Sequence, residues 1–148
     1  MQTIMWVLLV WVAAHSEYPL PSQLPEIQFR SQDELRRMYV CEEFNRCDEA
    51  NYHDESLKIA TLYKSKTQTM FFNEDFDILN PSNKAAALHE LVHYGQQLAG
   101  KFGSVCKGML EKEAYGLADE WLIENGFPPP KEKSVSRSLA ETCWEQDS

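Results

Sequence analysis

The sequence predicts a small α+β protein in which an antiparallel or mixed sheet packs on two helices. From residue 57 to residue 64 the side chains alternate as in a strand, with one face formed by Leu57, Ile59, Thr61 and Tyr63. A short apolar run follows at residues 69–72 and is expected to form a second strand. Apolar residues then recur every three or four positions through residues 81–99 and again through 110–122. That spacing places them on one side of an amphipathic helix, so both helices are expected to face the core.

The first 16 residues are predicted to be a secretory signal peptide. An apolar run from Ile4 to Ala14 is too short to span a bilayer, which needs about 20 residues. The segment Ala14-His15-Ser16 then offers a small-x-small cleavage site, although no Lys or Arg precedes the run. We therefore expect an exported protein, periplasmic or secreted, with no stable membrane association after signal removal. An uncleaved anchor and a cytosolic location are the alternatives.

The rest of the chain divides at proline-rich stretches. Residues 17–30 contain three prolines and are predicted to be an extended linker. A capping-box pattern from Ser31 to Glu34 opens the first helix of a single domain that is predicted to span residues 31–127. Residues 128–148 begin with three prolines and form a C-terminal tail. The tail either docks on the domain or crosses a cleft and keeps the protein inactive.

The pattern H-E-x-x-H at residues 89–93 is the most specific chemical signal in the chain. Asn80 is a good N-cap for the helix that carries it. Four positions make about one helical turn, so His89 and His93 share a face and can bind one metal ion. Glu90 lies at the edge of that face, where it can reach a metal-bound water. The alternative is a pair of surface histidines on an ordinary helix.

The second helix, at residues 111–122, contains candidates for a third ligand. Glu113 borders its apolar stripe, close in angle to residues that face the core. Glu111 lies on the far side of the stripe and is the weaker candidate. Both glutamates also fit the acidic first turn that the helix dipole favours.

These two helices resemble those of the gluzincins, zinc metallopeptidases with an H-E-x-x-H helix and a glutamate ligand on a second helix. The run at residues 111–122 also resembles the E-x-E-A-x-x-x-A helix of the small minigluzincin-like peptidases. The resemblance covers roughly residues 57–126 and implies a zincin-like fold. It departs from the thermolysin pattern at Leu117, where that family has an aspartate that supports a ligand histidine.

The resemblance implies that His89, His93 and Glu113 bind zinc and that Glu90 is the general base of peptide-bond hydrolysis. The expected substrate is a peptide or protein. The alternative is an inactive zincin scaffold that binds zinc or peptide without turnover. A donor for the developing oxyanion is expected among five residues, and the sequence does not choose between them: Tyr52, His53, Tyr63, Tyr94 and Tyr115.

Extended substrate is predicted to pair with an edge strand at Thr69, Met70, Phe71 and Phe72, as edge strands do in such folds. A strand buried by its own aromatic residues is the alternative. The formal net charge of −9 argues against nucleic acid and anionic membrane surfaces as partners.

Four cysteines suit disulfide bonds in an exported protein. They allow three pairings, of which the local one joins Cys41 to Cys47 and leaves Cys106 to join Cys143. A structural zinc site at Cys41, Cys47 and His53 is disfavoured because the spacing matches no common zinc module.

Overall fold

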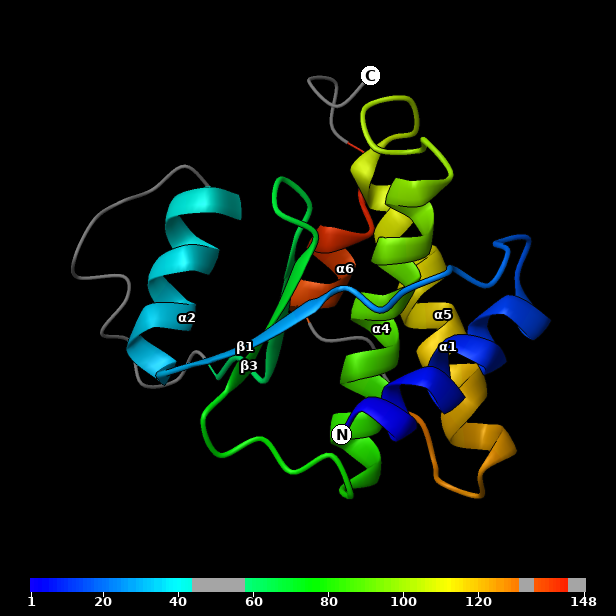
Figure 1. Ribbon diagram of the computed structural model, residues 1–148. Coiled ribbons are helices and arrows are strands. Elements are labelled where there is room, and N and C mark those ends of the chain that lie inside the picture. The colour runs from blue at the N-terminus through cyan, green and yellow to red at the C-terminus, as the bar shows by residue number, and fades with distance from the viewer. Residues whose placement is uncertain (44–57, 131–134, 144–148) are drawn as a thin grey trace. The chain divides into compact units, whose positions relative to one another are not determined.

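The computed structural model describes residues 1–43, 58–130 and 135–143 (Figure 1). The described residues form a mixed α+β structure, which confirms the predicted class. Their contacts separate into two compact units. We call residues 25–77 the sheet unit, and residues 1–24 with 78–148 the helical unit.

The sheet unit contains three strands, β1 (Glu26–Arg30), β2 (Thr61–Lys64) and β3 (Thr69–Asn73). β3 lies in the middle, parallel to β1 and antiparallel to β2. The tight connection between β2 and β3 is closed by a hydrogen bond from the Gln68 amide to the Ser65 carbonyl. β1 was not predicted, because its residues fall in the stretch interpreted as a linker.

The prediction of a substrate-binding edge strand at Thr69, Met70, Phe71 and Phe72 is wrong. These residues belong to β3, and both edges of β3 already pair with other strands. All four side chains are buried, in agreement with the alternative interpretation. A strand that is hydrogen-bonded on both sides has no backbone groups left for an extended peptide.

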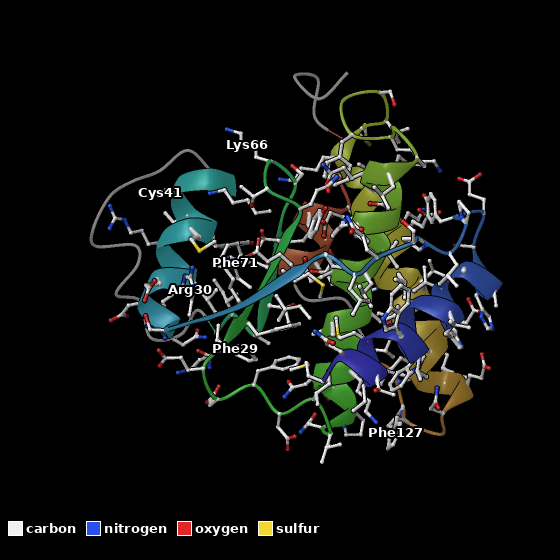
Figure 2. The ribbon with its side chains drawn as sticks, viewed as in Figure 1. Phe29, Arg30, Cys41, Lys66, Phe71 and Phe127 are labelled. Atoms are coloured by element: carbon white, nitrogen blue, oxygen red, sulfur yellow. A yellow bond between two sulfur atoms is a disulfide. The ribbon has the colours of Figure 1, made fainter. Side chains whose placement is uncertain are left out.

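One helix covers the hydrophobic residues of the sheet unit. α2 (Gln32–Met38) begins at Ser31, whose side chain accepts a hydrogen bond from the Glu34 amide, as the capping box predicts. It continues into a π-helical turn, η1 (Tyr39–Glu43). The buried core joins Leu35, Ile59 and Phe71. On β1, the Arg30 guanidinium lies 5.3 Å from the centre of the Phe71 ring (Figure 2).

The helical unit is built from α1 (Gln2–His15), α4 (Pro81–Leu98), α5 (Lys107–Glu124) and the short α6 (Val135–Ala140). α4 and α5 make the most extensive helix–helix contact, and α1 packs on α4 (Figure 1). No helix in the described part of the chain is long and apolar enough to cross a bilayer.

α1 contains the residues that were predicted to be a signal peptide. Its buried side chains are those of Met5, Leu8, Leu9 and Val12. Burial of four such side chains contributes roughly 6–12 kcal/mol, which is similar to the whole stability of a typical domain. In this structure the segment is therefore part of the hydrophobic core.

Leu8→Ala is expected to lower the free energy of unfolding by about 2–5 kcal/mol, because it removes a side chain that is 2% exposed and leaves a cavity. Val10→Ala is the matched control on the same helix, since Val10 is 51% exposed. It should change the free energy of unfolding by less than about 0.5 kcal/mol. Denaturant unfolding of the full chain measures both. Equal effects would show that α1 does not pack as described.

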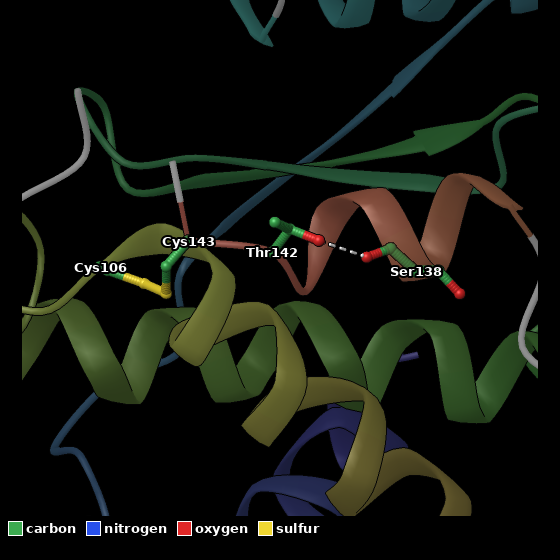
Figure 3. Close-up of a disulfide and its surroundings, with 4 residues drawn as sticks. All are labelled: Cys106, Ser138, Thr142 and Cys143. Atoms are coloured by element: carbon green, nitrogen blue, oxygen red, sulfur yellow. Dashed lines mark hydrogen bonds between the residues drawn. A yellow bond between two sulfur atoms is a disulfide. The ribbon is translucent and has the colours of Figure 1, made fainter. Parts of the chain in front are cut away.

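The C-terminal segment is joined to the start of α5 by the Cys106–Cys143 disulfide, which confirms that pairing (Figure 3). Gly108 allows the close approach, because a Cβ there would lie 2.5 Å from the Thr142 carbonyl oxygen. Cys47 lies outside the described residues, so its pairing with Cys41 remains a prediction. A disulfide is consistent with an exported protein.

Candidate metal centre

α4 begins and ends close to the predicted positions and carries the H-E-x-x-H residues in its middle. The Asn80 side chain accepts hydrogen bonds from the amides of Ser82 and Asn83, and Pro81 occupies the first turn. With this start, His89 and His93 lie one turn apart in the buried part of the helix. Their rings meet edge to face, with centroids 4.8 Å apart.

Both histidines meet a carboxylate from α5. The Nε2 atoms of His89 and His93 are 3.1 Å apart. The Glu111 carboxylate lies 2.6 Å from the His93 Nε2 and 3.4 Å from the His89 Nε2. One ligand atom from each of the three residues fits within 4.8 Å of the others, so the group could bind a metal ion. Two imidazoles and a carboxylate suit zinc, which takes nitrogen and oxygen ligands.

The third member of this group differs from the predicted one. Glu113 is not part of the group, and its carboxylate accepts hydrogen bonds from the Tyr18 hydroxyl and the Gln96 side-chain amide. Residues two apart on a helix lie about 200° apart, so Glu111 and Glu113 cannot face the same site. The rotation of α5 against α4 directs Glu111 to the histidines.

Electrostatic interactions hold His89, His93 and Glu111 together without a metal. Burial lowers the pKa of His93, but the hydrogen bond and negative charge of Glu111 outweigh that effect and raise it to about 9. Burial alone would raise the pKa of Glu111, but the hydrogen bonds and charges of the two histidines hold it well below its usual range. The cationic imidazole and the carboxylate thus form an ion pair, and a metal ion would replace the proton between them.

Glu90, the predicted general base, is 8% exposed. Its negative charge contributes to the raised pKa of His93, so the carboxylate acts electrostatically on the histidine group. Glu90 and Glu111 thus both act with negative charge on His93. Negative charge at this place favours a cation.

Tyr115, one of the five expected oxyanion donors, contacts His89. Its ring centre is 4.3 Å from that of His89, and the Arg137 guanidinium from α6 lies 4.6 Å from the Tyr115 ring centre. Arg137 also pairs with Asp119 of α5 at 2.9 Å, which docks the C-terminal segment on this helix. The Tyr94 hydroxyl instead donates to the backbone oxygen of Gln23.

Tyr63 is in β2 of the sheet unit, and Tyr52 and His53 are outside the described residues. Sequence reasoning missed Gln96, whose side chain is fully buried and hydrogen-bonded to His93. Its position three residues after His93 was the available signal, because such residues share a helix face.

Comparison with known proteins identifies the family of this chain. A family model described as a domain of unknown function, DUF6647, matches residues 1–148, so the chain belongs to that family. Neither the curated proteins nor the solved structures contain a significant match.

Proposed function

We propose that this member of the DUF6647 family is a zinc-dependent hydrolase of peptide bonds, with zinc held by His89, His93 and Glu111. One observation carries the proposal: a carboxylate from a separate helix meets both histidines of an H-E-x-x-H motif in a largely buried place. Three protein ligands leave a fourth position open, as in catalytic rather than structural zinc sites.

A zinc ion held there would supply a water of lowered pKa and polarise a peptide carbonyl. The role of Glu90 is to accept a proton from the attacking water on its carboxylate and to pass it to the leaving amine. The place of Glu90 next to His89, in the buried part of α4, supports this role. Tyr115 is proposed as the donor to the developing oxyanion, on the ground of its contact with His89.

Export is a further part of the proposal, supported by the Cys106–Cys143 disulfide. Cleavage after Ser16 would remove α1 and its four buried side chains from the helical unit. Mass spectrometry of the protein from its native host therefore decides whether the N-terminal segment acts as a cleaved signal or stays as a core helix.

The purified full-length protein is expected to bind about one zinc ion per chain and to cleave components of a diverse peptide mixture. A chelator should remove the activity, and added zinc should restore it. His89→Ala should abolish stoichiometric binding, because it removes one of three protein ligands. A wild-type protein without metal would refute the site, and a zinc-loaded protein without cleavage would favour the inactive scaffold.

A further inference from the structure

Gln96 connects the histidine group to the carboxylate that was predicted to be a ligand. Its side chain is fully buried on α4, one turn after His93. The Gln96 Oε1 lies 2.8 Å from the His93 Nδ1. The Gln96 Nε2 donates to the Leu110 carbonyl at 2.9 Å and to the Glu113 carboxylate at 3.0 Å.

These contacts decide which way the Gln96 amide is turned. A backbone carbonyl and a carboxylate only accept hydrogen bonds, so the amide atom between them must be the NH₂ group. The amide oxygen therefore faces His93 and can only accept. Its partner, the His93 Nδ1, must carry a proton. The other ring nitrogen, Nε2, is left to face Glu111 and His89, with a lone pair for a metal once its own proton is displaced.

Glu113 is itself held in place. The Tyr18 hydroxyl donates to its carboxylate, and the Tyr18 side chain lies against Gly95 of α4. A Cβ at Gly95 would lie 3.3 Å from the Tyr18 side chain, so glycine permits this approach. Burial, followed by the hydrogen bond to Glu113, raises the pKa of Tyr18 to about 12, and the hydroxyl therefore remains a donor at neutral pH.

The two histidines differ in whether their Nδ1 atoms have a hydrogen-bond partner. Among the described residues, the buried Nδ1 of His89 has no hydrogen-bond partner. The His93 Nδ1 has a partner that is itself fixed by two further contacts. His93 is therefore the imidazole whose tautomer and ring orientation the protein sets in advance.

We infer that Gln96 is the positioning residue of His93, and that Glu113 acts through Gln96 rather than as a ligand. The two residues hold a proton on the Nδ1 of His93 and direct its Nε2 to the metal position. They supply support for a ligand histidine, a role that the thermolysin pattern gives to an aspartate. The inference rests on the proposed zinc site.

Zinc titration of the full chain against a competing chelator tests the role. Gln96→Met keeps the length of the side chain and removes its hydrogen bonds. It should lower the zinc affinity by about 10–100-fold, the range measured when a partner of a ligand histidine is lost. Gln97→Met is the matched control on the same helix and should leave the affinity within about twofold.

A spectroscopic measurement on the wild-type protein makes the test independent of how well the variant folds. In the zinc-loaded protein, nitrogen NMR of the His93 ring should show zinc on Nε2 and a slowly exchanging proton on Nδ1. In Gln96→Met that proton should exchange quickly, because its acceptor is gone. Zinc on Nδ1 of the wild-type His93, or a rapidly exchanging proton there, would overturn the inference.

The outcomes separate the inference from the proposed function. If the wild-type chain binds no zinc, both the metal site and the role of Gln96 are refuted. If the wild type binds zinc and folded Gln96→Met binds it equally well, only the positioning role is refuted.

Discussion

Glu111→Gln is expected to lower the zinc affinity by more than about 100-fold, a greater loss than the 10–100-fold seen for partners outside the metal shell. The change replaces the carboxylate that lies 2.6 Å from the His93 Nε2 with a neutral amide of the same shape. The negative charge that attracts the cation is lost, and amides are poor zinc ligands. Zinc titration with a competing chelator measures the difference.

Glu113→Gln is the matched variant on the same helix. Its amide oxygen can still accept the hydrogen bond from Gln96, so its zinc affinity should fall by about tenfold at most. The resemblance to gluzincins, with Glu113 as the third ligand, predicts that Glu113→Gln loses more zinc affinity than Glu111→Gln. A large loss in Glu113→Gln, together with a small loss in Glu111→Gln, would show that the resemblance was right and that α5 is rotated differently in the metal-bound protein.

Glu90→Gln is expected to leave zinc in place and to lower peptide cleavage by about 10²–10⁴-fold, the usual contribution of a positioned general base. The amide keeps the size of the side chain but cannot accept the proton of the attacking water. Metal analysis and the cleavage rate are both needed, because they separate loss of the base from loss of the metal. Glu120→Gln changes an exposed glutamate of α5 and is the control. Equal cleavage by Glu90→Gln and the wild type would exclude Glu90 as the base.

Helix caps and apolar periodicity correctly predicted the elements that depend on interactions between neighbouring residues. The cap at Asn80 and the helical spacing after it located α4 to within two residues at its C-terminal end. The apolar stripe located α5, although the helix begins four residues before the predicted start. The capping box at Ser31 was also confirmed. Caps and periodicity depend on residues within a few positions of each other, so a single sequence contains them.

Elements that depend on distant partners could not be assigned from local patterns. β1 pairs in parallel with β3, more than 40 positions further along the chain, and its own five residues follow a proline-rich stretch. An apolar run such as Ile4–Ala14 has the same composition whether it is a signal peptide or a buried helix. What distinguishes the two in this structure is the contact of α1 with α4.

The helical repeat places His89, Glu90 and His93 in one region of a helix, so the motif alone was enough to predict that they lie together. Which glutamate meets them depends on how the two helices pack. Glu111 and Glu113 border the apolar stripe of α5 on opposite sides, about 200° apart around the axis. Either could face α4, and the choice depends on how α5 is turned when its apolar side chains pack. That rotation brings Glu111 to the histidines and Glu113 to Gln96. Packing between distant helices thus gives the two carboxylates different neighbours.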